Sequence, residues 1–237
     1  MDKWLPVMWM IYNCKNGVAS HEIARAIGVT QKTAWFMLHR IRLVQQGENA
    51  GKLGGEVEVD ETFIGGKARN MHQSKRAVKI HGTGGRDKTP VMGFLERGGD
   101  VRTAVVVNRK KSVLQDEVKK NVSAGAALYS DALASYDGLD GEFFHQVVDH
   151  AVEYVRGNVH TNGLENFWSL LKRGLKGTYV SVEPFHLFRY LDEQAWRYNN
   201  RKMTDAERFD LGVRHILGKR LTYRELTGKM PETETIN

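Results

Sequence analysis

Cysteine is almost missing from this sequence. Cys14 is the single cysteine among 237 residues, which excludes an internal disulfide and any zinc site that needs several thiolates. The sequence also lacks internal repeats, low-complexity tracts and an apolar run of the roughly 18 residues that a membrane-spanning helix needs. The apolar N-terminal stretch contains Pro6 and has no charged leader with a cleavage site, so it does not predict a signal peptide. We expect a cytoplasmic globular protein with no membrane partner.

Acidic side chains are in the minority but are unevenly distributed. The chain has 35 Lys and Arg against 28 Asp and Glu, a formal net charge of +7, which favours a polyanionic partner. Residues 121–155 nevertheless contain no Lys or Arg and six acids: Asp131, Asp137, Asp140, Glu142, Asp149 and Glu153. A protein that binds a polyanion and also collects cations accounts for such a window better than a protein that needs only net charge.

The order of the predicted elements indicates an α/β domain preceded by an all-α region. We expect residues 1–46 to be helical and the Gly-rich residues 47–56 to be a linker. Strands are predicted at 56–63, 91–97, 101–107, 126–131 and 145–148, with a helix at 112–122 and mostly helices afterwards, interrupted by a loop at 157–160 and by breaks near Gly177 and Gly218. Three strands, a helix and two more strands before long helices predict a mixed sheet flanked by helices.

Residues 20–42 have the pattern of a helix-turn-helix. Ser20 is a suitable N-cap, Gly28 can end the first helix in a left-handed conformation, and Thr30 can cap the second helix. Apolar side chains at helical spacing would pack the two helices together: Ile23, Ala24, Ile27, Ala34, Met37, Leu38 and Ile41. The exposed positions of the second helix would then be Gln31, Lys32, Thr33, Trp35, Arg40 and Arg42, which suit base edges and phosphates in a major groove. An ordinary helical hairpin with the same caps is the alternative.

Three carboxylates from separate segments form the candidate catalytic site. Asp60 lies in the strand "EVEVDETF", Asp131 ends the strand "AALYSD", and Glu165 lies beside the buried face of a predicted helix. Singly, they can be a strand-edge charge, a helix N-cap and a solvated helical residue. Together, two strand aspartates and a helix glutamate can converge at one edge of a sheet, where they suit Mg²⁺ and its oxygen ligands. Glu58 shares the face of Asp60 and Glu61 lies on the other face; neither receives a ligand role.

These blocks carry a family resemblance. "VEVDETFIGGK", "LYSDALASYDGL" and "HTNGLENFWSLLKRGLKG" resemble the catalytic blocks of bacterial insertion-sequence transposases with an RNase H-like DDE domain. "GVTQKTAWFMLHRIR" narrows the likeness to the subgroup whose N-terminus normally holds a zinc ribbon before a helix-turn-helix, and the likeness runs from about Trp4 to Tyr223. One cysteine cannot build the ribbon. We therefore expect a truncated copy or a shorter start, with weakened recognition of the transposon ends.

The resemblance implies an activity and its ligands. Asp60, Asp131 and Glu165 would hold two Mg²⁺ ions, or Mn²⁺, for cutting transposon ends and transferring them to target DNA. The 33 residues between Asp131 and Glu165 are typical of the family. Double-stranded DNA would be the partner and a homo-oligomer the assembly, at the bacterial nucleoid. The rival hypothesis is a catalytically silent DNA-binding regulator derived from a truncated transposase.

Four further residues are candidates for contacts with DNA or with the metal site. Lys172, seven positions after Glu165, would hold a terminal phosphate, unless it is a solvated helical lysine. Asn162 is the alternative third ligand, but we expect it to cap the helix. His160 would contact DNA or a metal-bound water, with a structural hydrogen bond as the favoured alternative. Lys67 belongs to a basic loop that can follow a DNA backbone, with a mobile, solvated loop as the alternative.

The predicted domains follow from these assignments. They are a helix-turn-helix region at residues 1–50, the RNase H-like catalytic domain at 51–204 and a helical tail at 205–237.

Overall fold

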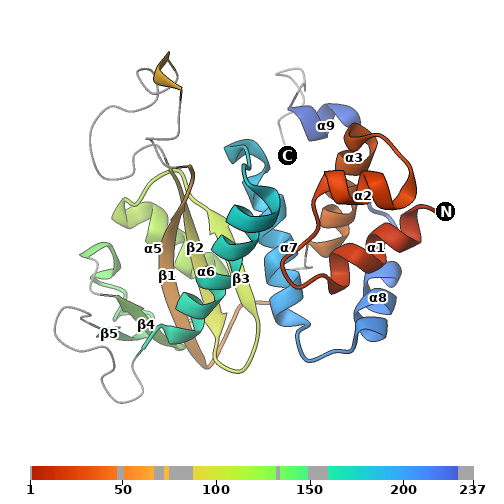
Figure 1. Ribbon diagram of the computed structural model, residues 1–237. Coiled ribbons are helices and arrows are strands. Elements are labelled where there is room, and N and C mark those ends of the chain that lie inside the picture. The colour runs from red at the N-terminus through yellow and green to blue at the C-terminus, as the bar shows by residue number, and fades with distance from the viewer. Residues whose placement is uncertain are drawn as a thin grey trace.

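Strand β1 (Glu56–Ile64) is the centre of a five-stranded sheet. The structure is a computed structural model that describes residues 2–46, 51–66, 72–74, 88–131, 134–148 and 160–228. On one side, β1 pairs antiparallel with β2 (Thr89–Glu96), and β2 pairs antiparallel with β3 (Val101–Val105). On its other side, β1 runs parallel to β4 (Ala127–Asp131), which runs parallel to β5 (Phe144–Val148). The order is β3-β2-β1-β4-β5 (Figure 1), so the predicted mixed sheet is confirmed.

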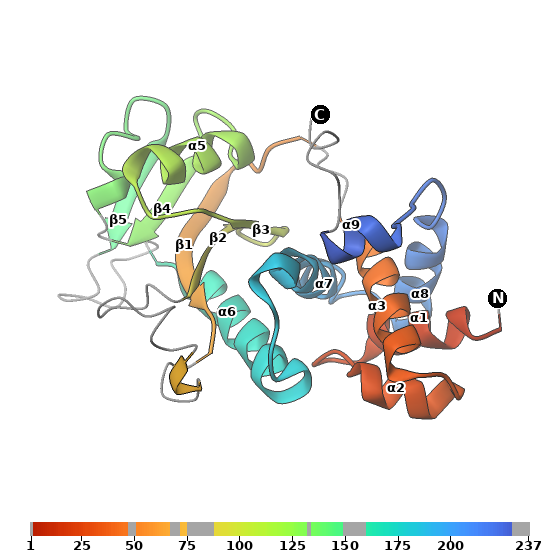
Figure 2. The same ribbon diagram turned by 90° about the horizontal axis from the view of Figure 1, so that it is seen from above.

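The alternation of side chains along β1 gives the sheet two different faces. Val57 and Val59 are buried in a core that includes Leu114 and Val118 of α5 (Lys111–Asn121). On the opposite face, β2 contributes Val91 and Leu95 to a core with α6 (Asn162–Gly174) and α7 (Leu187–Asn199). Figure 2 shows α5 on one side of the sheet and α6 on the other. Glu58 and Asp60 therefore face α6, as the alternation predicts.

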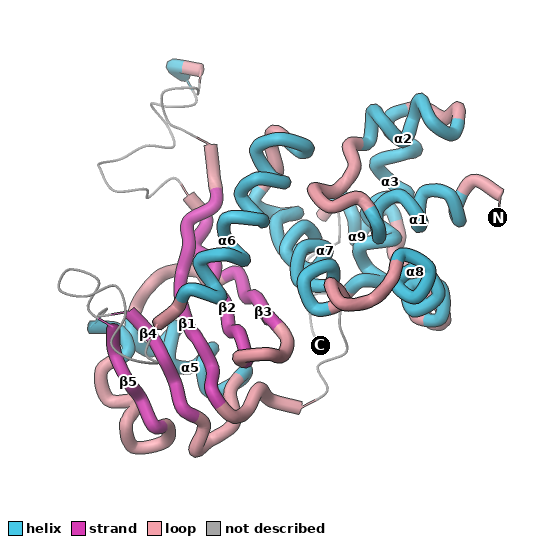
Figure 3. The backbone as a smooth tube through the Cα atoms, turned by 60° about the horizontal axis from the view of Figure 1, so that its bottom comes forward, coloured by secondary structure: helices cyan, strands magenta, loops and turns pink. Residues whose placement is uncertain are grey.

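The N-terminal helices share a second core with helices from the end of the chain. This core joins α1 (Trp4–Asn13), α2 (Ser20–Ile27) and α3 (Gln31–Gln45), and it also takes in Phe209 of α8 (Asp205–Arg214) and Trp196 of α7. Figure 3 shows α7 between the sheet and these helices. The predicted boundaries at residues 50 and 204 stay a prediction, but α8 packs with the N-terminal helices rather than as a separate tail.

The turn between α2 and α3 follows the prediction, but the N-cap of α2 does not. Gly28 has the left-handed φ of 63°, and Thr30 Oγ1 accepts the Thr33 N–H at 3.1 Å. Ser20 was predicted as the N-cap, but Ala19 holds that position and Ser20 is the first helical residue. The Ser20 hydroxyl instead accepts a hydrogen bond from Gln31 Nε2 at 2.8 Å, which ties the start of α3 to α2.

The second half of the chain contains short helical turns beside the long helices. A π-helical turn (Leu175–Tyr179) continues α6 past the break predicted at Gly177. A 3₁₀ turn (Pro184–His186) precedes α7, another (Ala134–Tyr136) follows β4, and α9 (Tyr223–Thr227) follows Gly218. The predicted loop at 157–160 lies outside the described residues except for His160. Within the described ranges, no helix is both long and apolar enough to cross a bilayer.

Arg42 departs from its prediction because it is buried rather than exposed. Only 1% of its side chain is exposed, and its Nε donates a 2.7 Å hydrogen bond to Glu193 Oε2 in α7. Arg197 and the Tyr179 hydroxyl also donate to Glu193. Burial alone would raise the pKa of Glu193, but the charges of Arg197 and Arg42 outweigh it, so this pKa is lowered from the ordinary 4.5. Arg42 thus joins α3 to α7 and does not face DNA.

We predict that Glu193→Gln destabilises the protein by about 3–5 kcal/mol near neutral pH, because it leaves two buried guanidinium groups without their carboxylate. Urea unfolding followed by circular dichroism measures the change. Glu193 has a lowered folded pKa, so its contribution is complete above pH 4.5 and is lost as the pH falls through the folded value. The difference between wild type and variant should therefore shrink in acid.

The matched control is Glu142→Gln, which removes the same charge from an exposed pair with Lys119. We expect that control to change stability by less than about 1 kcal/mol. Equal effects of the two substitutions would contradict the assignment of Glu193 as the anchor between α3 and α7.

Candidate metal centre

Asp60 and Asp131 lie side by side where β1 and β4 part. The parallel register pairs Val57 with Leu128 and Glu58 with Tyr129, and continuing it by two residues brings Asp131 next to Asp60. Each of Asp60, Glu61 and Asp131 offers a carboxylate oxygen, and these atoms all lie within 4.8 Å of one another. Strand pairing thus brings together the two predicted aspartates, which lie in separate segments of the sequence.

Asp60 is held as a charged group by two donors. Its Oδ1 accepts the Glu61 backbone N–H at 2.8 Å, and its Oδ2 accepts the Trp168 indole N–H at 3.0 Å. Burial and then the neighbouring Asp131 charge raise the pKa of Asp60 to about 6, while these two hydrogen bonds oppose the shift. Such a carboxylate lies among other carboxylates, and a nearby cation would stabilise its charged form.

Glu61 belongs to this group although its position in the strand argued against a ligand role. Only 2% of its side chain is exposed; it accepts a hydrogen bond from the Tyr136 hydroxyl, and its Oε2 lies 3.6 Å from Arg109 Nη2. Burial raises the pKa of Glu61 to about 7, with the Asp131 and Asp60 charges in support and Tyr136 and Arg109 opposed. Alternation does send Glu61 to the α5 side, but β4 ends here. At the end of a pairing strand, side chains from both faces can reach the same edge.

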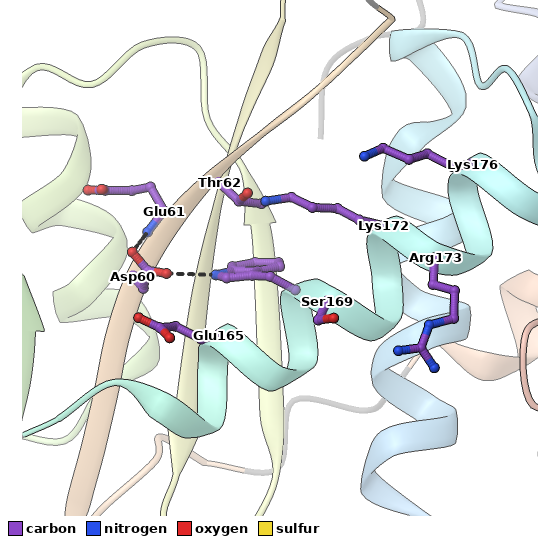
Figure 4. A pocket seen from close by; sticks show the side chains of 9 residues that line it. Asp60, Glu61, Thr62, Glu165, Ser169, Lys172, Arg173 and Lys176 are labelled. Carbon is purple, nitrogen blue, oxygen red and sulfur yellow. Dashed lines mark hydrogen bonds between the residues drawn. The ribbon is translucent and has the colours of Figure 1, made fainter. Parts of the chain in front are cut away.

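Glu165 lines the same pocket from the other side. The pocket has a volume of about 550 Å³ and is lined by Asp60, Glu61, Thr62, Glu165, Trp168, Ser169, Lys172, Arg173 and Lys176. Figure 4 shows Glu165, in the first turns of α6, extending toward Asp60. Its charge contributes to the raised pKa of Asp60, but its oxygens lie outside the tight group of Asp60, Glu61 and Asp131. The exposed Glu165 is therefore near the group without being packed into it.

Lys172 brings a positive charge to the carboxylate side of the pocket. Figure 4 shows its side chain extending from α6 toward Thr62, on the carboxylate side of the pocket. Burial lowers the pKa of Lys172, and the Asp60 charge opposes that change. The carboxylates, with Lys172 beside them and Lys176 further along α6, form a pocket that fits a phosphate chain bound through cations.

Glu58 positions the helix that carries Glu165. Its Oε2 accepts the Leu164 N–H at 3.0 Å, in the first turn of α6, where orphan donors and the helix dipole favour a negative charge. Its Oε1 lies 3.2 Å from Arg97 Nε and 3.4 Å from His160 Nδ1. The Arg97 guanidinium also donates to the His160 carbonyl oxygen at 2.9 Å. His160 thus makes structural contacts beside α6, as the favoured alternative predicted.

The remaining predicted residues fall in several places. Asn162 was expected to cap α6, but Thr161 holds the N-cap position; Asn162 is an exposed first helical residue and does not line the carboxylate pocket. Gln31, Lys32 and Thr33 are exposed at the start of α3. Arg40 is half-buried further along α3. Lys67 lies outside the described residues.

Comparison with known proteins finds a matching family model and related sequences. A family model described as the ISXO2-like transposase domain matches residues 52–199, a range that contains the whole five-stranded sheet with α5, α6 and α7. A transposase-like protein of Haemophilus influenzae is 34% identical over 101 residues, which are 42% of this chain and 81% of that protein. A protein in the transposable element ISH50 of Halobacterium salinarum is 28% identical over 189 residues, 74% of this chain and 62% of that protein. The carboxylate pocket thus lies within the matched domain.

Gly93 is the residue of β2 that lets Trp168 reach Asp60. A Cβ atom on Gly93 would lie 2.6 Å from Trp168 Cζ2 and 2.9 Å from Leu164 Cδ2. We predict that Gly93→Ala displaces the indole, weakens its hydrogen bond to Asp60 and destabilises the protein by about 1–3 kcal/mol. Thermal unfolding and tryptophan fluorescence measure the two effects.

Gly54→Ala is the matched control, because a Cβ there meets no atom within 4 Å. We expect it to change stability by less than about 0.5 kcal/mol. If Gly93→Ala behaves like this control, the close approach of β2 and Trp168 is not the reason for a glycine at position 93.

Proposed function

The chain belongs to the ISXO2-like transposase family, and from that premise we propose that it cuts the ends of an insertion sequence and joins them to target DNA. Its RNase H-like domain would act on double-stranded DNA through a DDE site made by Asp60, Asp131 and Glu165. The observation that carries the proposal is the close approach of Asp131 to Asp60, which lines one pocket together with Glu165 and Lys172. Together with the family match, it favours an enzyme over a silent regulator.

The donor set fits divalent metal ions. Three carboxylate oxygens within 4.8 Å of one another, two of them on groups with raised pKa, supply the hard oxygen ligands that Mg²⁺ and Mn²⁺ prefer. Asp60 and Asp131 of this group, with Glu165 from the same pocket, would hold the ions, two being the expected number; Glu61, the third member of the group, would add negative charge beside them. When bound, such ions activate an attacking oxygen and stabilise the leaving oxygen of a phosphodiester.

The proposed reaction has two transfers at phosphorus. In the first, a water oxygen bonds to the phosphorus at a transposon end, and the 3′ oxygen leaves as a hydroxyl. In the second, that 3′ hydroxyl attacks a phosphodiester of the target and displaces its 3′ oxygen. The protein forms no covalent bond to DNA in either step. Trp168 and the Glu61 N–H keep Asp60 ionised and oriented, and Lys172 would bind a phosphate oxygen.

The α2–α3 unit is proposed to bind the transposon ends. Its short turn, with Gly28 in the left-handed region and Thr30 as a cap, supports the helix-turn-helix hypothesis. Gln31 and Thr33 also make side-chain hydrogen bonds to Ser20 and Thr30, so Lys32 is the freer exposed side chain of the three for a phosphate or base contact. An assembly of two or more copies would hold the two ends together.

We predict that Asp60→Asn reduces metal-dependent cleavage of DNA carrying the element's ends by at least about 100-fold. Duplex binding should be unchanged, because the substitution lies in the pocket and not on α3. Gel analysis of nicked products, with Mg²⁺, Mn²⁺ or a chelator, measures cleavage. Asp116→Asn, an exposed position on α5, is the control and should retain full activity. A wild-type protein that binds DNA but never cleaves it would contradict the proposal and favour a regulator.

A second pair of variants tests the third carboxylate. Glu165→Gln keeps the shape of the side chain and removes its charge, so we expect it to lose cleavage almost as completely as Asp60→Asn. Asn162→Ala should keep most activity, because Asn162 lies one turn away and does not line the carboxylate pocket. Full cleavage by Glu165→Gln, measured in the same gel assay, would move the ligand role away from Glu165.

A further inference from the structure

A segment from the end of the chain docks on the outward face of α3. The ring of Tyr223, at the start of α9, stacks on Phe36 of α3 with centroids 5.2 Å apart and planes at 18°. Lys32 Nζ lies 6.0 Å from the centroid of the Tyr223 ring, and the Arg40 guanidinium lies 5.1 Å from that of Phe36. The aromatic pair therefore brings the segment beside the two cationic positions of α3 that were predicted to contact DNA.

Buried leucines fix this segment while its charges stay exposed. Leu221 is 8% exposed and Leu226 is 4% exposed. Between them, Thr222 caps α9, and its N–H and hydroxyl both hydrogen-bond to Glu225 Oε2, at 2.6 and 2.8 Å. Lys219 and Arg220, just before Leu221, are exposed. The cations are thus held in place by their own segment rather than by acidic partners.

The junction between α3 and this segment is a basic pocket. Its volume is about 460 Å³, and its lining consists of Arg40, Leu43, Lys219, Arg220, Leu221, Thr222 and Tyr223. Three of these residues are cationic and none is acidic. Within the described ranges, Arg40, Lys219 and Arg220 form no ion pair closer than 4.0 Å. Glu225 accepts hydrogen bonds from Thr222, which are the largest causes of its lowered pKa, and the Arg220 charge adds a smaller contribution.

Concentrated positive charge without counter-charges destabilises the free protein and is relieved by a polyanion. We propose that α3 and residues 219–223 form one composite site for the phosphodiester backbone of duplex DNA, in which Arg40, Lys219 and Arg220 contact phosphates. Lys32, whose Nζ lies over the Tyr223 ring, extends the same positive surface toward the start of α3. The choice of DNA as the polyanion rests on the proposed function; the site itself rests on the pocket and its charges.

The composite site shares no lining residue with the carboxylate pocket. It therefore adds a separate DNA contact made by parts of the chain that are far apart in sequence. A helix-turn-helix alone would not include Lys219 or Arg220. With them, the DNA backbone on one side of α3 would be contacted from two elements of the chain.

The test compares the full-length Lys219→Gln/Arg220→Gln double variant with wild type. The probe is a fluorescently labelled 30-base-pair duplex of arbitrary sequence, and its binding is followed by anisotropy in a chelator across a salt series. Loss of two phosphate contacts should weaken binding at least about 10-fold at 0.1 M salt and reduce the slope of log K against log salt by about 2. A dissociation constant and slope equal to those of the control below would overturn the proposal.

The control is Lys15→Gln/Lys202→Gln, which removes the same two charges from exposed positions outside the pocket. We expect it to weaken binding less than about 3-fold. Tyr223→Ala, which keeps every charge, should weaken binding because the segment loses its stack on Phe36; unchanged binding would show that docking does not build the site. Thermal unfolding of all variants verifies that they fold.

Two further measurements separate the alternatives. Polyglutamate is titrated in place of the duplex; if the double variant loses polyglutamate binding but keeps duplex binding, the site takes acidic peptides and the proposal is wrong. Cleavage of element ends by the wild-type protein with Mg²⁺ is measured independently. Since the binding assay contains no metal, a protein that fails to cleave can still pass the binding test, and the two failures stay distinguishable.

Discussion

Repulsion among carboxylates that share one edge of the sheet is the constraint on which the site depends. Asp60, Glu61 and Asp131 approach within 4.8 Å, and the pKa values of Asp60 and Glu61 rise to about 6 and 7. Backbone pairing of β1 with β4 brings the aspartates close, because the parallel register that ends at Glu58 and Tyr129 leaves Asp60 and Asp131 two residues further along each strand. Donors from three further elements steady the group: Trp168 from α6, Tyr136 after β4 and Arg109 before α5. The fold thus holds together carboxylates whose charged forms a divalent cation would stabilise.

Two other buried carboxylates of the protein, Glu193 and Glu58, have cationic partners. Glu193 is fully buried, with two guanidinium groups and a tyrosine hydroxyl around it, and its pKa is lowered. Glu58 is equally hidden but receives Arg97, His160 and the first turn of α6. These two carboxylates attach helices: Glu193 joins α7 to α3, and Glu58 fixes the start of α6. The contrast in pKa direction between Glu193 and Asp60 distinguishes a carboxylate paired with buried guanidinium groups from one held among other carboxylates.

Local sequence patterns predicted the sheet and the shared face of Glu58 and Asp60. Most features that the sequence did not predict depend on partners distant in sequence. The alternation of "VEVDETF" placed Glu58 and Asp60 on one face, and the order of elements predicted the mixed sheet, because both depend on neighbours in sequence. Arg42 was predicted to be exposed because its partner Glu193 is 151 residues away. Glu61 was set aside because alternation says nothing of where the neighbouring strand stops. The α6 cap was missed because the carboxylate at that helix end, Glu58, comes from β1.

The ion pair of Arg42 with Glu193 joins α3 to α7, and α7 in turn packs against α6. The helix of Arg42, α3, carries Lys32 and Arg40 on the outward face, while Arg42 itself is bonded to Glu193 of α7 on the inward face. In turn α7 packs in one core with Leu164, Phe167 and Trp168 of α6, the helix that bears Glu165 and Lys172. A duplex bound to α3 and residues 219–223 would therefore be held by the same rigid set of helices that orients the carboxylate pocket. On this interpretation, the buried ion pair stabilises the fold and also sets the distance between the bound DNA and the bond that is cut.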